Sequence, residues 1–210
     1  MTKEHKPSAG QKPAAVLLTL AAILVPLLPL FFWLRESLSL MPSPVETPSF
    51  GLYLLARAFA LIGFVLMFYQ FILTARLPFL EKLFQRSRLV KRHRLLGRIG
   101  FSLILLHGVI LLVQDLSLYS AKTLGLIALI LLTITVAAAS LAKPLKLSVK
   151  TWRTVHLAAY VVFPLAFIHA LSLGSTVLGY RPVYWLFVLL SVIYFLILLR
   201  RIVRGIRKTG

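Results

Sequence analysis

Six apolar stretches dominate the sequence, and each approaches or exceeds the roughly 20 residues that an α-helix needs to cross the hydrocarbon core of a bilayer. Their approximate ranges are 14–34, 51–75, 95–114, 123–142, 154–173 and 183–203. Only five of the 210 residues are acidic and 60% are hydrophobic, so the chain could not build a soluble surface. We therefore predict an all-α bundle of six transmembrane helices in a multi-pass protein embedded in a lipid bilayer.

The sequence shows no separate soluble domain. We predict one membrane domain over 14–204, with polar tails at 1–13 and 205–210. The connection 36–50 contains three prolines, and this composition predicts an extended loop between the first two helices.

The basic residues are concentrated on alternate connections. The N-terminal tail, 76–98, 143–153 and 200–208 together hold 20 of the 24 Lys and Arg residues. By the positive-inside rule, both termini and both basic loops are cytoplasmic. The net charge of +19 does not predict nucleic-acid binding, because these residues are spread among four sites at one membrane face, where lipid headgroups account for them.

Four of the five histidines form two pairs on two apolar helices, and the fifth, His5, lies in the N-terminal tail. His93 and His107 are 14 residues apart on the third stretch, and His156 and His169 are 13 apart on the fifth. At about 1.5 Å per residue, each spacing covers roughly 20 Å along a helix. An imidazole in hydrocarbon is costly and calls for a partner, so these residues are candidates for function.

The predicted topology makes the third and fifth helices run in the same direction. It therefore predicts an inner pair, His93 with His156, near the cytoplasmic face, and an outer pair, His107 with His169, about four turns further out. Two imidazoles from different helices are the ligand set of a six-coordinate haem b. We predict two b-type haems stacked between these helices, a path for single electrons across the membrane. The sequence contains no cysteine, so thiolate ligation and iron–sulfur clusters are excluded.

Other interpretations of the histidines remain open at this point. A single histidine in an apolar helix is more often hydrogen-bonded to a neighbouring helix than bound to metal. Zinc also binds imidazole, although the two levels are too far apart for one zinc site. A cofactor-free transporter would use intramembrane histidines together with acids, and in an assembly subunit they would only hydrogen-bond.

One feature of the fifth helix does not fit an ideal geometry. At roughly 100° per residue, the 13-residue spacing leaves His156 and His169 about 140° apart around the helix axis. Pro164 lies between them, and a kink at that proline would change the phase.

Three sequence segments carry a family resemblance: RLPFLEKLF from Arg76, KRHRLLGRIGFSLILLHG from Lys91, and TWRTVHLAAYVVFPLAFIH from Thr151. With the histidine spacings, they resemble the ferric reductase-like transmembrane domain. That domain is shared by NADPH oxidases, ferric reductases and the haem membrane subunit of bacterial methionine sulfoxide reductase. The resemblance implies that His93 and His156 hold the inner haem and that His107 and His169 hold the outer one.

The resemblance also implies roles for several arginines. Arg57, in LLARAFA, matches an arginine near the outer haem, and Arg76 matches one near the inner haem propionates. A buried cation at Arg57 needs an anion, which a propionate supplies; the alternative is that its side chain extends to the outer interface. Arg92, Arg94 and Arg98 are further candidates for the inner propionates, although topology alone would place them there.

The resemblance implies an electron-transfer function. Electrons would enter from a cytoplasmic flavin reductase or another flavoprotein carrying FAD or FMN, and leave to oxygen, ferric iron or an extracytoplasmic acceptor protein. The sequence contains no glycine-rich dinucleotide fingerprint, so we expect the electrons to come from another polypeptide or the chain to be part of a longer enzyme. Leu111 stands where animal oxidases carry a further histidine, which makes superoxide production a weaker expectation. We expect an oxidoreductase component of the bacterial inner membrane.

Overall fold

The computed structural model describes residues 12–40 and 48–206, and every regular element within these ranges is a helix. Six helical spans are long and apolar enough to cross a membrane, so the prediction of a multi-pass, all-helical membrane protein is confirmed. The spans are α1 (Lys12–Leu24) with α2 (Leu27–Leu40), α3 (Pro48–Thr74), α5 (Arg86–Gln114), α6 (Ser120–Leu141), α7 (Val149–His156) with α8 (Ala159–Leu173), and α10 (Arg181–Ile206). Two short helices, α4 (Pro78–Leu83) and α9 (Ser175–Gly179), connect spans.

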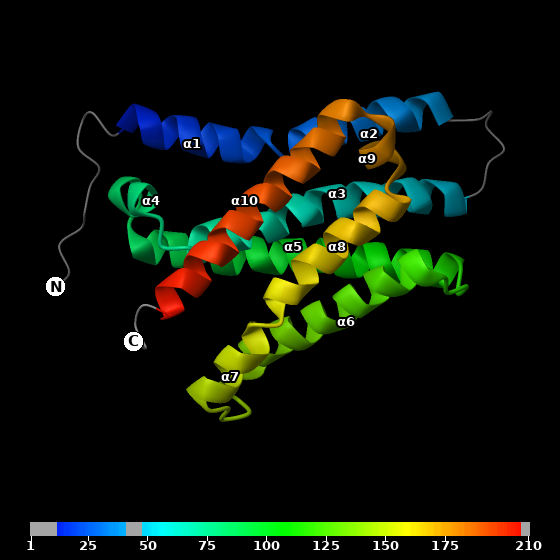
Figure 1. Ribbon diagram of the computed structural model, residues 1–210. Coiled ribbons are helices and arrows are strands. Elements are labelled where there is room, and N and C mark those ends of the chain that lie inside the picture. Colours follow the sequence, from blue (N-terminus) through cyan, green and yellow to red (C-terminus); the bar gives the residue numbers. More distant parts are fainter. Residues whose placement is uncertain (1–11, 41–47, 207–210) are drawn as a thin grey trace.

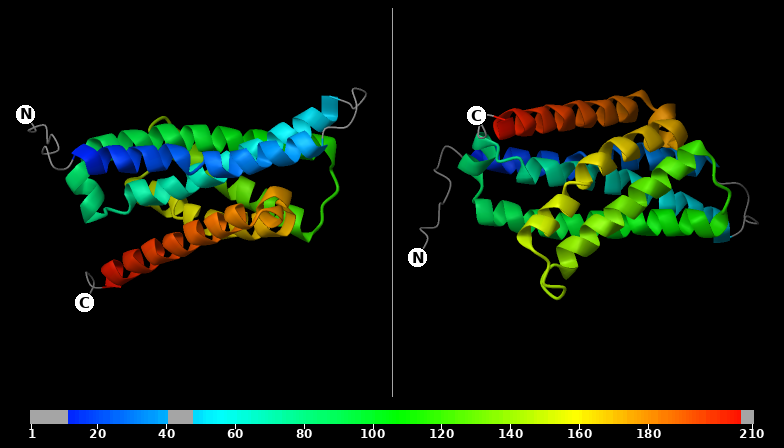
Figure 2. Two further views of the ribbon diagram at one scale, coloured as in Figure 1. Left: turned by 90° about the horizontal axis from the view of Figure 1, so that it is seen from above. Right: turned by 60° about the horizontal axis from the view of Figure 1, so that its bottom comes forward.

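The spans form an elongated bundle with chemically different ends (Figures 1 and 2). One end, which we call the basic end, contains α4, the start of α5, the α6–α7 connection and the end of α10. The opposite end contains the α5–α6 connection and α9. The basic segments 76–98 and 143–153 thus lie at the same end, as alternate connections of a membrane bundle must.

The bundle is centred on α3. In the most apolar part of each span, half of the residues of α3 are buried, against 6% of those of α5. Helix α3 is therefore the core helix, and α5 lies at the surface of the bundle. Phe64 of α3 stacks on Phe187 of α10, with ring centroids 4.2 Å apart and planes 5° from parallel. Phe64 also stacks on Phe163 of α8 at 4.9 Å. Aromatic packing therefore joins the second, fifth and sixth spans.

Two glycines bring α5 close to α3. A Cβ atom on Gly63 would lie 2.6 Å from Ile104 Cγ1, and one on Gly100 would lie 3.1 Å from Leu66 Cβ. Small residues at a helix contact allow backbones to approach closely in lipid, where no hydrophobic force draws helices together. Helix α5 carries His93 and His107, and this contact fixes where it lies along α3.

Three expectations about helix boundaries change. The predicted loop 36–50 was too long, because α2 continues to Leu40 and α3 begins at Pro48. The first span is divided into α1 and α2 at residues 25–26, where Pro26 lacks the N–H for a helical hydrogen bond. Helix α5 begins nine residues before its apolar stretch, since charged residues form a helix as readily as apolar ones. Residues 1–11, 41–47 and 207–210, with His5, most of the N-terminal tail and the end of the C-terminal one, lie outside the described residues.

Candidate haem site

The structure places the four membrane histidines in two facing pairs. His93 of α5 lies beside His156, the last residue of α7, with ring centroids 6.4 Å apart and planes at 77°. His107 of α5 lies beside His169 of α8, again with centroids 6.4 Å apart and planes at 68°. The inner pair is nearer the basic end, and the outer pair is nearer the opposite end. Each pair joins two different spans.

The spacing within each pair leaves room for one metal atom. Imidazole nitrogens lie about 1.1 Å from the ring centre and bind metals at about 2.0–2.1 Å, so two rings on opposite sides of a metal have centres about 6.3 Å apart. The observed 6.4 Å in both pairs fits this value. The helices around the pairs are arranged to keep the gap: α5 packs on α3 and α8 packs on α6, while α5 and α8 are not a closely packed pair.

The outer histidines are oriented by main-chain carbonyls of neighbouring helices. Nδ1 of His107 bonds to the carbonyl oxygen of Ala56 on α3 at 3.0 Å, and Nδ1 of His169 to that of Ala121 on α6 at 2.8 Å. A carbonyl oxygen can only accept, so both Nδ1 atoms carry the proton. Nε2 of each ring is then the unprotonated nitrogen that can bind a metal, the arrangement usual for metal-ligating histidines.

The inner pair repeats this arrangement in a looser form. The carbonyls of Gln70 and Thr135 are the counterparts of those of Ala56 and Ala121, each 14 residues further along α3 or α6. They lie beside His93 and His156 without completing a hydrogen bond of normal geometry, so both Nδ1 atoms are buried and unpartnered. Unpartnered buried polar atoms are uncommon in folded proteins, and metal or cofactor sites are one place where they occur.

The number of ligands distinguishes between kinds of metal site. Among the described residues, no three or more His, Cys, Asp or Glu side chains gather around a common point. A structural zinc ion needs four ligands, so neither pair alone would satisfy it. Two facing imidazoles suit a metal whose four remaining positions are filled by a macrocycle, and this is the axial ligand set of a haem.

Gly125 of α6 makes space for the outer pair. A Cβ atom at this position would lie 2.6 Å from Cε1 and 2.7 Å from Nδ1 of His169. Any larger residue would push the ring away from its position opposite His107. This glycine was not identified from the sequence, because a glycine inside an apolar helix carries no signal of what faces it.

The phase change between His156 and His169 occurs at a different place from the one predicted. The helix is interrupted at Leu157 and Ala158, seven and six residues before Pro164, which lies inside α8. The main-chain bonds from Ala158 to Val155 (3.0 Å) and from Val161 to Ala158 (2.9 Å) span three residues rather than four. This tighter winding rotates α8 relative to α7.

Pro164 leaves its helix largely intact because another helix compensates for it. Proline has no N–H to donate to the carbonyl four residues earlier, here that of Tyr160. The hydroxyl of Tyr194 on α10 donates to this carbonyl oxygen instead, at 2.5 Å. The interruption of the helix between the two histidines thus lies before the proline, at Leu157 and Ala158.

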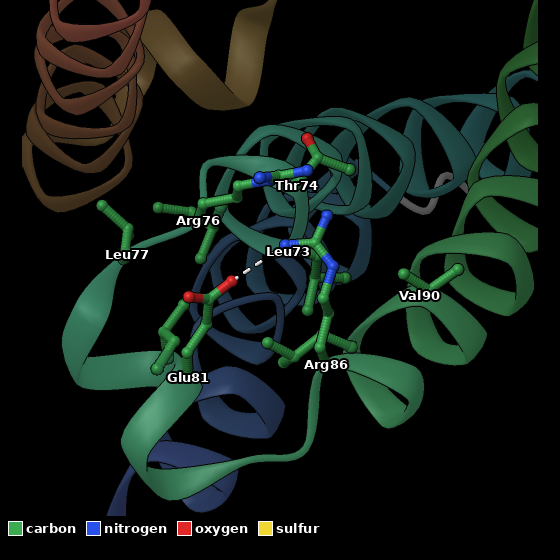
Figure 3. A pocket seen from close by; sticks show the side chains of 10 residues that line it. Leu73, Thr74, Arg76, Leu77, Glu81, Arg86 and Val90 are labelled. Carbon is green, nitrogen blue, oxygen red and sulfur yellow. Dashed lines mark hydrogen bonds and ion pairs between the residues drawn. The ribbon is translucent and has the colours of Figure 1, made fainter. Parts of the chain in front are cut away.

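The predicted arginines lie in three different environments. Arg57 is mostly buried and pairs with Glu36 of α2, with Nη2 2.6 Å from Oε1. Arg76, at φ 50°, lies between α3 and α4 and lines a surface pocket with Glu81 and Arg86, which form an ion pair at 3.1 Å (Figure 3). The arginines at the start of α5 are exposed, namely Arg92, Arg94 and Arg98.

Two charged residues near the histidine pairs were not identified from the sequence. Glu36 was assigned to a loop, although a lone acid next to an apolar stretch could have marked it. Arg201 of α10 lies over the ring of Tyr160, four residues after His156, with Cζ 4.9 Å from the centroid. It was counted only as part of the basic C-terminal segment.

The family is established by comparison with known proteins. Residues 59–167, just over half of the chain, match the family described as "Ferric reductase like transmembrane component". The chain belongs to this family, in agreement with the sequence resemblance. The matched segment contains His93, His107 and His156, and it ends two residues before His169. No curated protein matches the chain.

Proposed function

We propose that the protein transfers single electrons across the membrane through two b-type haems. His93 and His156 would hold the inner haem, and His107 and His169 the outer one. The observation that carries this proposal is the presence of two facing imidazole pairs, both with a centroid spacing of 6.4 Å, at two levels of a six-span bundle. Membership of the ferric reductase-like family supports electron transfer as the class of function.

The chain's own residues would bind, orient and insulate. In the outer pair the Ala56 and Ala121 carbonyls hold the proton on Nδ1 and leave Nε2 to bind an iron, and such bonds would raise the basicity of the ligand. Two histidines per haem would fill the positions that the macrocycle leaves open, which favours electron transfer over the binding of a gas molecule. When bound, haem supplies reversible one-electron chemistry. The apolar spans would keep water away from the path.

The charge distribution supports an orientation and a donor. The basic end would face the cytoplasm, with both termini on that side. A cytoplasmic flavin reductase or flavoprotein with FAD or FMN would deliver electrons there. The outer haem would pass them to oxygen, ferric iron or an extracytoplasmic partner protein. We place this oxidoreductase component in the bacterial inner membrane, surrounded by lipid and without a nucleic-acid partner.

The cofactor-free alternatives have less support. A proton-coupled transporter needs acids beside its histidines, and the one acid in the described spans, Glu36, is neutralised by Arg57. An assembly subunit would use its histidines as hydrogen-bond partners of neighbouring helices. The outer pair makes such bonds only through Nδ1, which leaves Nε2 as the nitrogen that can bind a metal, and the inner pair makes no hydrogen bond of normal geometry at Nδ1.

Transfer across sealed vesicles tests the proposal. The purified protein is reconstituted in vesicles that contain trapped ferricyanide, and reduced FMN is added outside. We expect bleaching of ferricyanide with the parent protein and with His5→Ala, which removes the histidine outside the two pairs. The double variant His107→Ala/His169→Ala should reduce its inner haem and leave ferricyanide unchanged. Bleaching by this variant at the parental rate would contradict the proposal.

A further inference from the structure

A buried ionic cluster joins three helices near the outer histidine pair. Glu36 of α2 is the only acid within the six described spans. Its Oε1 lies 2.6 Å from Arg57 Nη2, and its Oε2 accepts a hydrogen bond of 2.6 Å from Thr176 Oγ1 of α9. Arg57 Nη2 also donates to Thr176 Oγ1 at 2.8 Å. We call Glu36, Arg57 and Thr176 the clasp.

The polar groups of the clasp bond to one another, and its side chains are largely buried. The side chains of Arg57 and Glu36 are 12% and 15% exposed, and Thr176 is 2% exposed. Both carboxylate oxygens have a partner, and the guanidinium also lies over the ring of Tyr53 at 5.6 Å. A buried pair of opposite charges is tolerable only when its hydrogen bonds are satisfied in this way, and removing one partner leaves a buried, unpaired charge.

The clasp is one residue away from a contact of the outer pair. Ala56, which precedes Arg57, is fully buried, and its carbonyl accepts the hydrogen bond from His107 Nδ1. On the same turn of α3, the carbonyl of Leu54 accepts a bond of 3.0 Å from Trp33 Nε1 of α2. This turn therefore contacts α2 on one side and His107 on the other.

We propose that Glu36, acting through Arg57, is a positioning and charge-balancing residue for the outer haem. Glu36 and Thr176 hold Arg57, and with it the Ala56 carbonyl that orients His107. Glu36 also cancels the guanidinium charge, so the outer haem binds beside a neutral pair and not beside a free cation. This inference rests on the proposed function. It gives Arg57 a different partner from the haem propionate that the family resemblance implies.

The sign of two redox shifts tests the proposal. An unbalanced positive charge favours the reduced haem, which carries one more negative charge. Glu36→Gln keeps the side-chain shape and should raise the midpoint potential of the outer haem. Arg57→Met leaves the carboxylate and should lower it. The double variant Glu36→Gln/Arg57→Met should return toward the parent, and in all three the inner haem should keep its potential.

The matched control is Glu81→Gln, which removes a carboxylate from an exposed ion pair near the basic end and should shift neither haem. The proposal is overturned if Glu36→Gln leaves the outer potential unchanged or lowers it. It is also overturned if the two haems shift equally. A purely structural clasp would lower stability in both single variants without giving shifts of opposite sign.

A second measurement is independent of haem. Each single variant should lower the thermal unfolding midpoint in detergent, and the double variant should recover most of the loss, because it removes both charges together. Absence of recovery would contradict the clasp itself. If the protein binds no haem, the proposed function fails. The unfolding midpoints of the two single variants and the double variant still decide whether the clasp exists.

Discussion

The inner and outer histidine pairs have the same spacing but are held differently. In both, the ring centroids are 6.4 Å apart. The outer rings are each fixed by a main-chain carbonyl, whereas the inner rings have buried Nδ1 atoms without a partner. Because the spacing is the same with and without these hydrogen bonds, the comparison indicates that helix packing sets the distance between the rings.

The two pairs also differ in their electrostatic surroundings. Cationic side chains stand near the inner pair, because Arg92 and Arg94 flank His93 in the sequence and Arg201 lies over the ring of Tyr160, four residues after His156. Each cation next to a carbonyl that contacts the outer pair has an acidic partner: Arg57, after Ala56, pairs with Glu36, and Lys122, after Ala121, pairs with Asp115. The inner site is thus the more positive of the two.

The largest expected effect is loss of one haem at a time. His107→Ala and His169→Ala should each remove or convert the outer haem, because the two residues face each other across one site. His93→Ala and His156→Ala should do the same to the inner haem. Haem content and the visible spectrum of each variant provide the measurement. If His107→Ala and His156→Ala removed the same haem, the division into two levels would be wrong.

A partial loss confined to the outer haem is expected for Gly125→Ala. The added Cβ would overlap the His169 ring and displace it from its axial position. The matched control is Gly51→Ala, since a Cβ at Gly51 meets nothing within 4 Å. Low-spin haem signals in electron paramagnetic resonance distinguish the two. Equal spectra for the two glycine variants would mean that Gly125 does not set the outer geometry.

The potentials of the two haems should differ, with the inner one higher. Positive charge at the inner site favours its reduced form, and hydrogen-bonded, more basic imidazoles at the outer site favour the oxidised form. Arg201→Gln should narrow the gap by lowering the inner potential alone. A redox titration, assigned with the histidine variants, measures both values. An outer haem with the higher potential would reverse this part of the comparison.

The sequence predicted the parts of this structure that depend on periodicity and on composition. The six spans follow from hydropathy, and the two histidine levels follow from spacing and from the direction of the helices. It did not predict the clasp, because Glu36 and Thr176 are 140 residues apart and only packing brings them together. It also did not predict the interruption at Leu157 and Ala158, because no proline or glycine marks that place in the sequence.

The smallest expected effect concerns Asp115 in the α5–α6 connection, at the end of the bundle opposite the basic end. Hydrogen bonds from Ser117, and then from Lys122, lower the pKa of Asp115 from 3.8 to about 2. Lys122 follows Ala121, whose carbonyl orients His169. Because the pKa of Asp115 is lowered in the folded protein, its ionised carboxylate stabilises the fold. This stabilisation is fully present above pH 3.8 and is lost as the pH falls through about 2.

We therefore expect a slight change of the outer haem signal in that acidic range, with the inner signal steady. Asp115→Asn should remove this pH dependence. A spectroscopic pH titration of parent and variant provides the test, and an identical dependence in both proteins would exclude Asp115 as its source.

The most direct test of the central claim is the haem content of the purified parent protein, combined with its spin state. Two facing imidazole pairs predict two b-type haems per chain, both low-spin because each iron has two axial histidines. A colourless protein, or one with a single haem per chain under conditions that saturate binding, would contradict the two-level account.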